Sequence, residues 1–291
     1  MADVIFVGLS TIDVLYSVDK FPKANEKVAA RSQEVFVGGP ATNACIAYAH
    51  LGGKAALVTA VGKHPLAAMA REEAVRYGIQ LIDLNAQFAG VPPISSVTVA
   101  KNGQRNVVSA NAVRVETPET AVDHHVLDKA RMLMVDGHYM QACQAWAAAA
   151  RVLGKPVVFD GGSWKDGCDE LLKNVTTAIC SADFLPPGSK DGKQVVEYLR
   201  ARGVTNVAIT HGSEPIEFIS GMSSGTLRVP HVEVVDTTGA GDVLHGAYCY
   251  HASLGHGFIE ALSEAAEIAA ESCRYEGTRA WMEMQAVGAR D

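Results

Sequence analysis

Short apolar runs recur along most of this chain. The first, Val4–Val7, is unbroken and ends at Gly8. Such runs are typical of strands that are buried on both faces of a parallel sheet. Similar runs predict further strands at residues 56–61, 79–84, 132–135, 156–159, 176–180 and 206–210. Apolar residues at helical spacing predict helices at residues 40–51, 65–77, 141–153, 192–202, 241–254 and 258–275. This alternation predicts an α/β fold with a doubly wound, mostly parallel sheet flanked by helices.

Two segments follow a different pattern. Residues 16–37 are mixed and lack helical periodicity. Residues 94–100 alternate between apolar and polar side chains, residues 101–104 have the composition of a turn, and residues 106–108 lead back. This is the pattern of a β-hairpin. We therefore expect a small β-sheet from about residues 12–37 and 92–111, within a single domain that spans residues 1–291.

Composition narrows the class of protein. The chain has 291 residues, of which 48% are hydrophobic and 20% charged, enough for one large domain. Its net charge of −7 disfavours a nucleic-acid-binding protein. No apolar run approaches the roughly 18 residues of a membrane helix, and the N-terminus lacks the basic segment of a signal peptide. The six cysteines form no C-x-x-C pair, so we expect reduced thiols and a cytoplasmic location.

The chemistry is concentrated in a glycine-rich turn. Residues 235–246 read Val-Asp-Thr-Thr-Gly-Ala-Gly-Asp-Val-Leu-His-Gly, and we expect residues 232–235 to end a strand and a helix to begin near Gly241. Glycine allows backbone amides to approach a ligand closely, and a helix N-terminus binds phosphate. Gly239, Ala240 and Gly241 could thus form an anion hole. Asp242, expected to be ionised at pH 7, could take the proton of an attacking hydroxyl during phosphoryl transfer. A simple capped turn is the alternative.

A second glycine pair opens an earlier helix. Gly38 and Gly39 precede Pro40, which suits the first position of a helix, and Asn43 falls in the first turn. Asp13 follows the first strand at a short distance. Each could be a plain capping or turn residue. A carboxylate and an amide, however, could also hold the hydroxyl groups of a substrate.

Both glycine motifs carry a family resemblance. The string Asp236–Asp242, Asp-Thr-Thr-Gly-Ala-Gly-Asp, resembles the C-terminal signature of the ribokinase (PfkB) family of sugar and nucleoside kinases. Gly-Gly-x-x-x-Asn at residues 38–43 resembles its N-terminal signature, whose glycines and asparagine contact sugar hydroxyls. The resemblance covers nearly the whole chain. Residues 19–43 and 236–246 look closest to ketohexokinase-like and sulfofructose-kinase-like members.

The resemblance implies roles for individual residues. The catalytic set is Asp242 with Gly239, Ala240 and Gly241. The small sheet becomes a β-lid over the sugar, and the substrate set is Asp13, Gly38, Gly39, Asn43, Lys27, Arg105 and Asn111. The nucleotide set is Thr210, Gly212, Gly239, Gly241 and Gly277. Asp236 is the candidate for binding a monovalent cation, and Asp183 is the candidate linked to magnesium.

The middle of the chain departs from the family pattern. Many members have Asn-x-x-Glu near the magnesium and phosphates, whereas residues 181–187 read Ser-Ala-Asp-Phe-Leu-Pro-Pro. Thr-x-Gly is present at residues 210–212, but the glycine expected after it is replaced by residues 213–215. The donor nucleotide is therefore less well specified than the phosphate-transfer centre.

We expect an ATP-dependent kinase that phosphorylates a hydroxyl group of a small fructose- or ribose-like sugar. Its cofactors would be ATP and Mg²⁺, with K⁺ as a further candidate, and the family implies a homodimer formed through the lid. Three alternatives remain open at this point: a kinase of an anionic sugar derivative, a kinase of a nucleoside, and a family member that binds a metabolite without catalysis. The chain has no Walker A motif and no Rossmann G-x-G-x-x-G.

Overall fold

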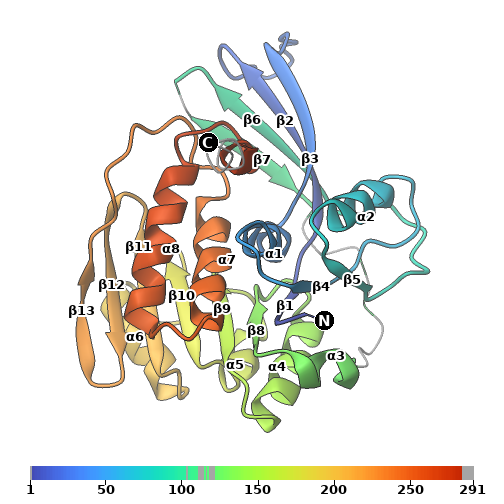
Figure 1. Cartoon of the computed structure of the whole chain (residues 1–291). Coiled ribbons are helices and arrows are strands. Elements are labelled where there is room, and N and C mark those ends of the chain that lie inside the picture. The colour runs from blue at the N-terminus through green and yellow to red at the C-terminus, as the bar shows by residue number, and fades with distance from the viewer. Residues whose placement is uncertain (1, 103, 111–114, 116, 118–121, 284–291) are drawn as a thin grey trace, which may run out of the picture.

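A large sheet forms the centre of the molecule (Figure 1). The computed structural model describes residues 2–102, 104–110, 115, 117 and 122–283. Nine strands lie in the order β13-β12-β11-β10-β9-β8-β1-β4-β5. Their bounds are β1 Val4–Val7, β4 Ala55–Thr59, β5 Gln80–Asp83, β8 Met132–Val135, β9 Val157–Gly161, β10 Thr177–Ser181, β11 Asn206–His211, β12 Glu214–Ser220 and β13 Ser223–Leu227. The strands from β5 to β11 pair in parallel, and β12 and β13 extend the sheet as an antiparallel hairpin.

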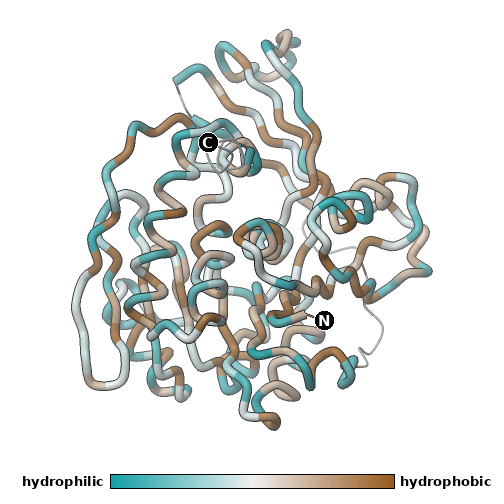
Figure 2. Tube along the Cα trace, viewed as in Figure 1, coloured by the Kyte–Doolittle hydropathy of each residue, from teal (hydrophilic) through white to brown (hydrophobic). Residues whose placement is uncertain are grey.

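Helices cover both faces of this sheet. Val4 and Phe6 point to the face that packs against α1 (Pro40–His50), α7 (Ala240–Ser253) and α8 (Phe258–Ser272). Ile5 and Val7 point to the opposite face, because side chains alternate along a strand. That face carries α3 (His124–Lys129), α4 (Met140–Val152), α5 (Cys168–Leu172) and α6 (Gly192–Ala201). The hydropathy colouring of Figure 2 shows that apolar positions recur on the strands and helices of the molecule. The predicted α/β fold class is confirmed.

A separate four-stranded sheet projects beyond one end of the large sheet (Figure 1). Its strands are β2 (Thr11–Val18), β3 (Ser32–Gly38), β6 (Ile94–Ala100) and β7 (Arg105–Ser109), in the order β3-β2-β6-β7. The β2–β6 pair is parallel, and the two outer pairs are antiparallel. The predicted hairpin of residues 94–108 therefore lies in this small sheet and not in the central one. A further helix, α2 (Ala67–Arg76), packs near the base of the small sheet.

One predicted strand is wrong. Residues 232–235 form no strand, and Val234 and Val235 are largely exposed. The backbone amides of Val235 and Asp236 both donate to the carbonyl of Cys273, at 2.8 and 3.1 Å, so this segment is held by the end of α8. Alternating valines predicted a strand, but this segment belongs to neither of the two sheets in the described part of the chain.

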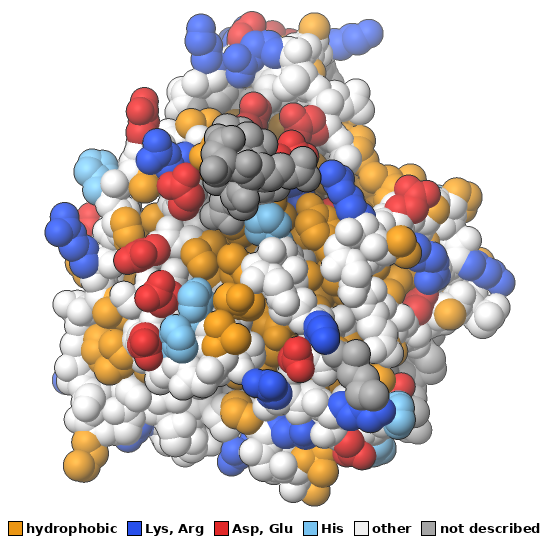
Figure 3. Space-filling view, in the orientation of Figure 1, with side chains coloured by type: hydrophobic (Ala, Val, Ile, Leu, Met, Phe, Trp, Pro, Cys, Tyr) orange, Lys and Arg blue, Asp and Glu red, His pale blue; other side chains and the backbone are white. Residues whose placement is uncertain are grey.

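The surface carries both signs of charge. On the face shown in Figure 3, acidic and basic side chains are interspersed around the apolar patches. Within the described residues, no helix combines the length and apolar character needed to cross a membrane.

Candidate active site

The glycine turn before α7 leaves an open helix N-terminus. Gly239 is the N-cap residue and has a left-handed φ of 74°, and a Cβ there would lie 2.6 Å from Thr278 Cγ2. The amide of Val243 donates to the Gly239 carbonyl at 2.9 Å, as expected for the first turn of a helix. The preceding amides, at Gly241 and Asp242, have no acceptor within the helix. A Cβ added at Gly241 would meet no atom within 4 Å, so the turn borders open space, and amides at a helix N-terminus are suited to binding phosphate.

A hydrogen-bond chain joins the two predicted halves of the site. Asn43 Nδ2 donates to Asp242 Oδ2 at 2.7 Å, across 199 positions in the sequence. Arg279 Nη1 donates to Asn43 Oδ1 at 3.0 Å, and its Nε donates to Glu73 Oε1, also at 3.0 Å. Arg279 Nη2 donates to the carbonyl of Val37 at 2.9 Å. The candidate base, Asp242, and the candidate sugar-binding residue, Asn43, are thus hydrogen-bonded to each other, and Arg279 links Asn43 to the end of β3.

The environment of Asp242 differs from the prediction. Burial, reinforced by the carboxylate of Asp160, raises the pKa of Asp242 to about 7, although the Asn43 amide and His245 act in the opposite direction. The sequence predicted an ionised carboxylate at pH 7, whereas a pKa of about 7 means that the protonated and ionised forms coexist at that pH. A helix N-terminus favours the anion, but here the loss of water around the carboxyl group has the larger effect. A pKa close to the working pH is the property that general-base catalysis requires.

Asp13 lies against the second glycine pair. It belongs to β2 of the small sheet, and Thr11 Oγ1 donates to its Oδ1 at 2.6 Å. A Cβ at Gly38 would come within 1.8 Å of Asp13 Oδ2, and one at Gly39 (φ 100°) within 2.2 Å of the Leu9 carbonyl oxygen. Burial raises the pKa of Asp13, opposed by hydrogen bonds from Thr11 and Ser95 and by the charge of Arg279. Gly38 therefore makes room for the carboxyl group of Asp13, and Gly39 makes room for the Leu9 carbonyl group, at the start of α1.

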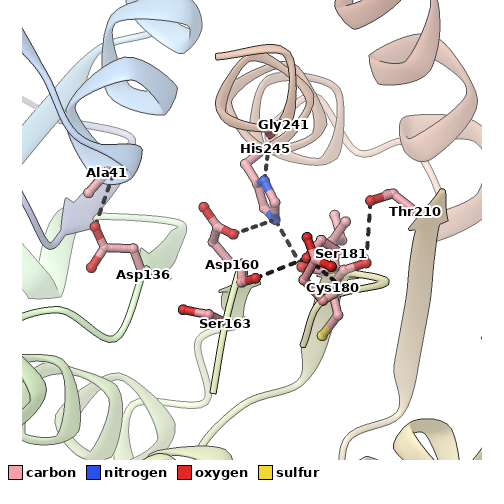
Figure 4. A network of polar contacts seen from close by, with 12 residues as sticks. Ala41, Asp136, Asp160, Ser163, Cys180, Ser181, Thr210, Gly241 and His245 are labelled. Carbon is pink, nitrogen blue, oxygen red and sulfur yellow. Dashed lines mark hydrogen bonds and ion pairs between the residues drawn. The ribbon is translucent and has the colours of Figure 1, made fainter. Parts of the chain in front are cut away.

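A buried carboxylate holds the sugar-side backbone together. Asp136, directly after β8, accepts hydrogen bonds from the amides of Leu9 at 2.8 Å, Ala41 at 3.2 Å and His138 at 2.9 Å. Figure 4 shows its contact with Ala41 at the N-terminus of α1. Asp136 directly follows the strand that the sequence predicted at residues 132–135. Its three backbone donors indicate that it fixes the loops that surround the candidate substrate site.

The nucleotide-side candidates lie on glycine turns. Gly212 and Gly277 have left-handed φ angles of 65° and 70°, and a Cβ at either position would meet no atom within 4 Å. Asp236 accepts from the amide and hydroxyl of Thr238 at 2.9 and 2.7 Å, and from the amide of Gly277 at 2.9 Å. It thus ties the turn before α7 to the turn that contains Gly277. Thr210 lies in β11, one residue before its end, and donates from its hydroxyl to the Cys180 carbonyl at 3.4 Å.

Several residues that were predicted to belong to the site form no hydrogen bond or ion pair with the residues described above, as far as the structure describes them. Lys27 and Arg105 are exposed on the small sheet and its connection, and Asn111 lies outside the described residues. Asp183 is exposed, whereas its neighbour Phe184 is fully buried against Phe159. In the part of the chain that the structure describes, no group of three or more His, Cys, Asp or Glu side chains could hold a metal ion.

Three residues that the structure brings into the site were assigned no role from the sequence. Arg279 comes two positions after Gly277, and nothing in its surroundings distinguishes it from a surface arginine. Asp160 was recognisable only as a polar residue at a strand end. His245 stands inside the glycine motif, where helical spacing could have placed it on the same side of α7 as Asp242.

Comparisons with known proteins agree with this geometry. A family model described as pfkB family carbohydrate kinase matches residues 1–284. The chain belongs to this family. It is 22% identical to a ribokinase of Haemophilus influenzae over 94% of this chain and 92% of that protein. It is 26% identical to an ATP-dependent ribose-1-phosphate kinase of Halopiger xanaduensis over 85% of this chain and 84% of that protein.

The fold comparison agrees as well. The structure of Arabidopsis thaliana ribokinase complexed with ribose and ATP superimposes with a TM-score of 0.80 at 20% identity, covering 95% of this chain and 94% of that one. The predicted ribokinase/PfkB membership is confirmed. As a pfkB family carbohydrate kinase, the chain is a phosphotransferase whose acceptor is a sugar hydroxyl group. The nearer resemblance to ketohexokinase-like and sulfofructose-kinase-like members stays a prediction.

Proposed function

We propose that this pfkB family kinase transfers the γ-phosphoryl group of ATP to a hydroxyl group of a small ribose- or fructose-like sugar, with Asp242 as general base. One observation carries the proposal. Asp242, at the open N-terminus of α7, is hydrogen-bonded at 2.7 Å to Asn43. A base, an anion hole and a hydroxyl ligand therefore lie within one small region, as phosphoryl transfer requires.

Each group has a defined task in this mechanism. Asp13 and Asn43 hold the sugar hydroxyls, so that the attacking oxygen faces the γ-phosphorus in line. Asp242 accepts the proton of that hydroxyl as the new P–O bond forms. The amides of residues 239–242 stabilise the charge on the transferring group. Mg²⁺, when bound with ATP, neutralises charge on the β- and γ-phosphates. Asp236 is our candidate ligand for K⁺, and Asp183 our candidate link to Mg²⁺.

An anionic sugar derivative is the second candidate substrate. The relative from Halopiger xanaduensis is named a ribose-1-phosphate kinase, and it has the higher identity of the two curated relatives described above. Lys27 and Arg105 lie on the small sheet and its connection, where they could meet an anionic group if that sheet closes over the sugar. A nucleoside acceptor would instead require apolar contacts from the same sheet.

The substrate is identified by measuring ADP release from ATP with a panel of acceptors. The panel contains ribose, deoxyribose, fructose, ribose 1-phosphate and adenosine, and EDTA-treated reactions serve as the metal-free control. We expect one class of free or phosphorylated sugar to give turnover that EDTA abolishes. Turnover that persists without divalent metal, or turnover with adenosine alone, would contradict the proposal.

Replacing Asn43 with alanine is expected to raise KM for the sugar at least tenfold and KM for ATP less than twofold. The amide contacts the sugar in our mechanism but lies apart from the nucleotide turns. Loss of its hydrogen bond should also raise the pKa of Asp242, since Asn43 lowers it. Steady-state kinetics with each substrate varied in turn measure the KM for the sugar and the KM for ATP. Equal changes in the two KM values would place Asn43 outside the sugar site.

We also propose a homodimer formed through the small sheet. Strands β3 and β7 are its edges, and Val107 and Val108 on β7 are 54% and 75% exposed. An exposed edge with apolar side chains favours pairing with another sheet. Val108→Lys is therefore expected to shift the mass measured by light scattering from dimer to monomer, and Val152→Lys, at an 87% exposed position of α4, is the matched control. A wild-type monomer would contradict this proposal.

We also propose a cytoplasmic location, because the cysteines are present as free thiols. All six cysteines are free, and five of them are buried. Burial raises the pKa of Cys143 and Cys249 well above the ordinary thiol value, which keeps these groups protonated and unreactive. Such thiols suit a reducing compartment.

A further inference from the structure

His245 has an unusual pair of hydrogen-bond partners. It lies in α7, three residues after Asp242, and only 5% of its surface is exposed. Its Nδ1 is 2.7 Å from the carbonyl oxygen of Gly241, and its Nε2 is 3.1 Å from the carbonyl oxygen of Ile179 in β10. Figure 4 shows the ring placed between the start of α7 and the ends of the central strands.

Both of these partners are acceptors only. A neutral imidazole carries one N–H group, so one of its nitrogens would direct a lone pair at a carbonyl oxygen. A doubly protonated ring donates to both. The required counter-charge is present, because Asp160 Oδ1 lies 3.7 Å from Nε2 and only 7% of Asp160 is exposed. Buried charges are retained in proteins when they are paired in this way.

We propose that His245 is a positioning residue that acts as an imidazolium, joining the N-terminus of α7 to Asp160 and to the carboxyl end of β10. Through Gly241 it fixes the turn that supplies the anion hole. His245 stands in the second turn of α7, so its positive charge would lie near the helix N-terminus where we propose that phosphate binds, and it would offset the charge of Asp160. A neutral residue at position 245 would leave Asp160 as an unpaired buried carboxylate beside the triphosphate site.

The charges around this position act in opposite directions on Asp242. The carboxylates of Asp160 in β9 and Asp136 after β8 raise the pKa of Asp242, whereas the Asn43 amide and His245 lower it. Cys180 in β10 does not add charge, because burial and Asp160 raise the pKa of its thiol far above the ordinary value. His245 is therefore the one cation among the groups that set the protonation of the base, as far as the described residues show.

The inference rests on the proposed function, because it assigns His245 to the support of Asp242 and the phosphate site. Its test needs no sugar substrate and so can fail separately from the proposed function. In ¹⁵N spectra of the histidine rings of the full chain at about pH 7, we expect both ring nitrogens of His245 to carry a proton. A ring with a single proton would overturn the proposal, whatever the enzyme phosphorylates. The signal is assigned by its loss in His245→Gln or through scalar couplings to the α7 backbone.

A second measurement follows the carboxyl group of Asp242. Its ¹³C titration midpoint is expected to rise by about one pH unit in His245→Gln, since a nearby opposite charge lowers an acid's pKa by roughly 1–3 units. The control is His251→Gln, which changes a histidine of the same helix that lies outside the site. An equal midpoint in the two variants would overturn the proposal. If His245→Gln does not fold, the wild-type ring spectrum still decides it.

Discussion

Replacing Asp242 with asparagine is expected to lower kcat by about 10²–10⁴-fold while the protein still binds sugar and nucleotide. The range is that of the loss of a general base. Asparagine keeps the shape of the side chain and leaves the amides of the anion hole in place. It cannot, however, accept the proton of the attacking hydroxyl. Steady-state kinetics give kcat, and calorimetric titration gives the affinities for the sugar and for MgADP.

A matched variant separates catalysis from helix capping. Asp191 is the N-cap residue of α6, and its side chain accepts from the amide of Gln194 at 2.9 Å, away from the site. Because asparagine caps a helix about as well as aspartate, Asp191→Asn should leave kcat unchanged. If Asp242→Asn also had near-normal kcat, Asp242 would be a capping residue and the proposed mechanism would be wrong.

The second large effect concerns pH. Because Asp242 must be deprotonated to act and its pKa is about 7, kcat/KM should fall about tenfold for each pH unit below pH 7. At pH 5 activity should therefore be roughly 100-fold below its plateau. Asp242→Asn should lose this acid limb. An ordinary carboxylate, with a pKa of about 4, would instead give a flat profile between pH 5 and pH 8, and such a profile in the wild type would contradict the assignment.

The same raised pKa predicts a trend in stability. Asp242 has a higher pKa in the folded protein than in the unfolded chain, so the folded state binds more protons between about pH 4 and pH 7. The contribution of Asp242 to stability is full below the unfolded pKa and is lost as the pH rises through about 7. Asp242→Asn should therefore gain in Tm relative to wild type as pH increases. A difference in Tm that does not vary with pH would mean that burial does not perturb this carboxyl group.

The sequence predicted the features that local patterns determine. Unbroken apolar runs such as Val4–Val7 mark strands that are buried on both faces, and these strands form the centre of the sheet. Gly38, Gly39 and Gly239 stand at the starts of α1 and α7, where a side chain would collide with neighbouring atoms. Gly38 leaves room for Asp13, and Gly39 has a positive φ. These requirements are local, so they are visible in a single sequence.

Long-range contacts explain what the sequence did not predict. Arg279 bonds to Asn43 across 236 positions, and a lone arginine carries no sign of such a partner. The pKa of Asp242 depends on burial and on Asp160, which only the folded chain brings close. The valines of residues 232–235 alternate like a strand but meet the end of α8 in place of a strand edge. In each case the decisive neighbour is distant in sequence.

The most direct test of the central claim is a single-turnover measurement of phosphoryl transfer. Enzyme saturated with the sugar identified in the acceptor panel is mixed with a limiting amount of γ-³²P-labelled MgATP and quenched at short times. We expect that label appears in the sugar phosphate as fast as ADP forms, and that Asp242→Asn binds the nucleotide but transfers label at least about 100-fold more slowly. Transfer at the wild-type rate in Asp242→Asn, or ADP formed without labelled sugar, would contradict it.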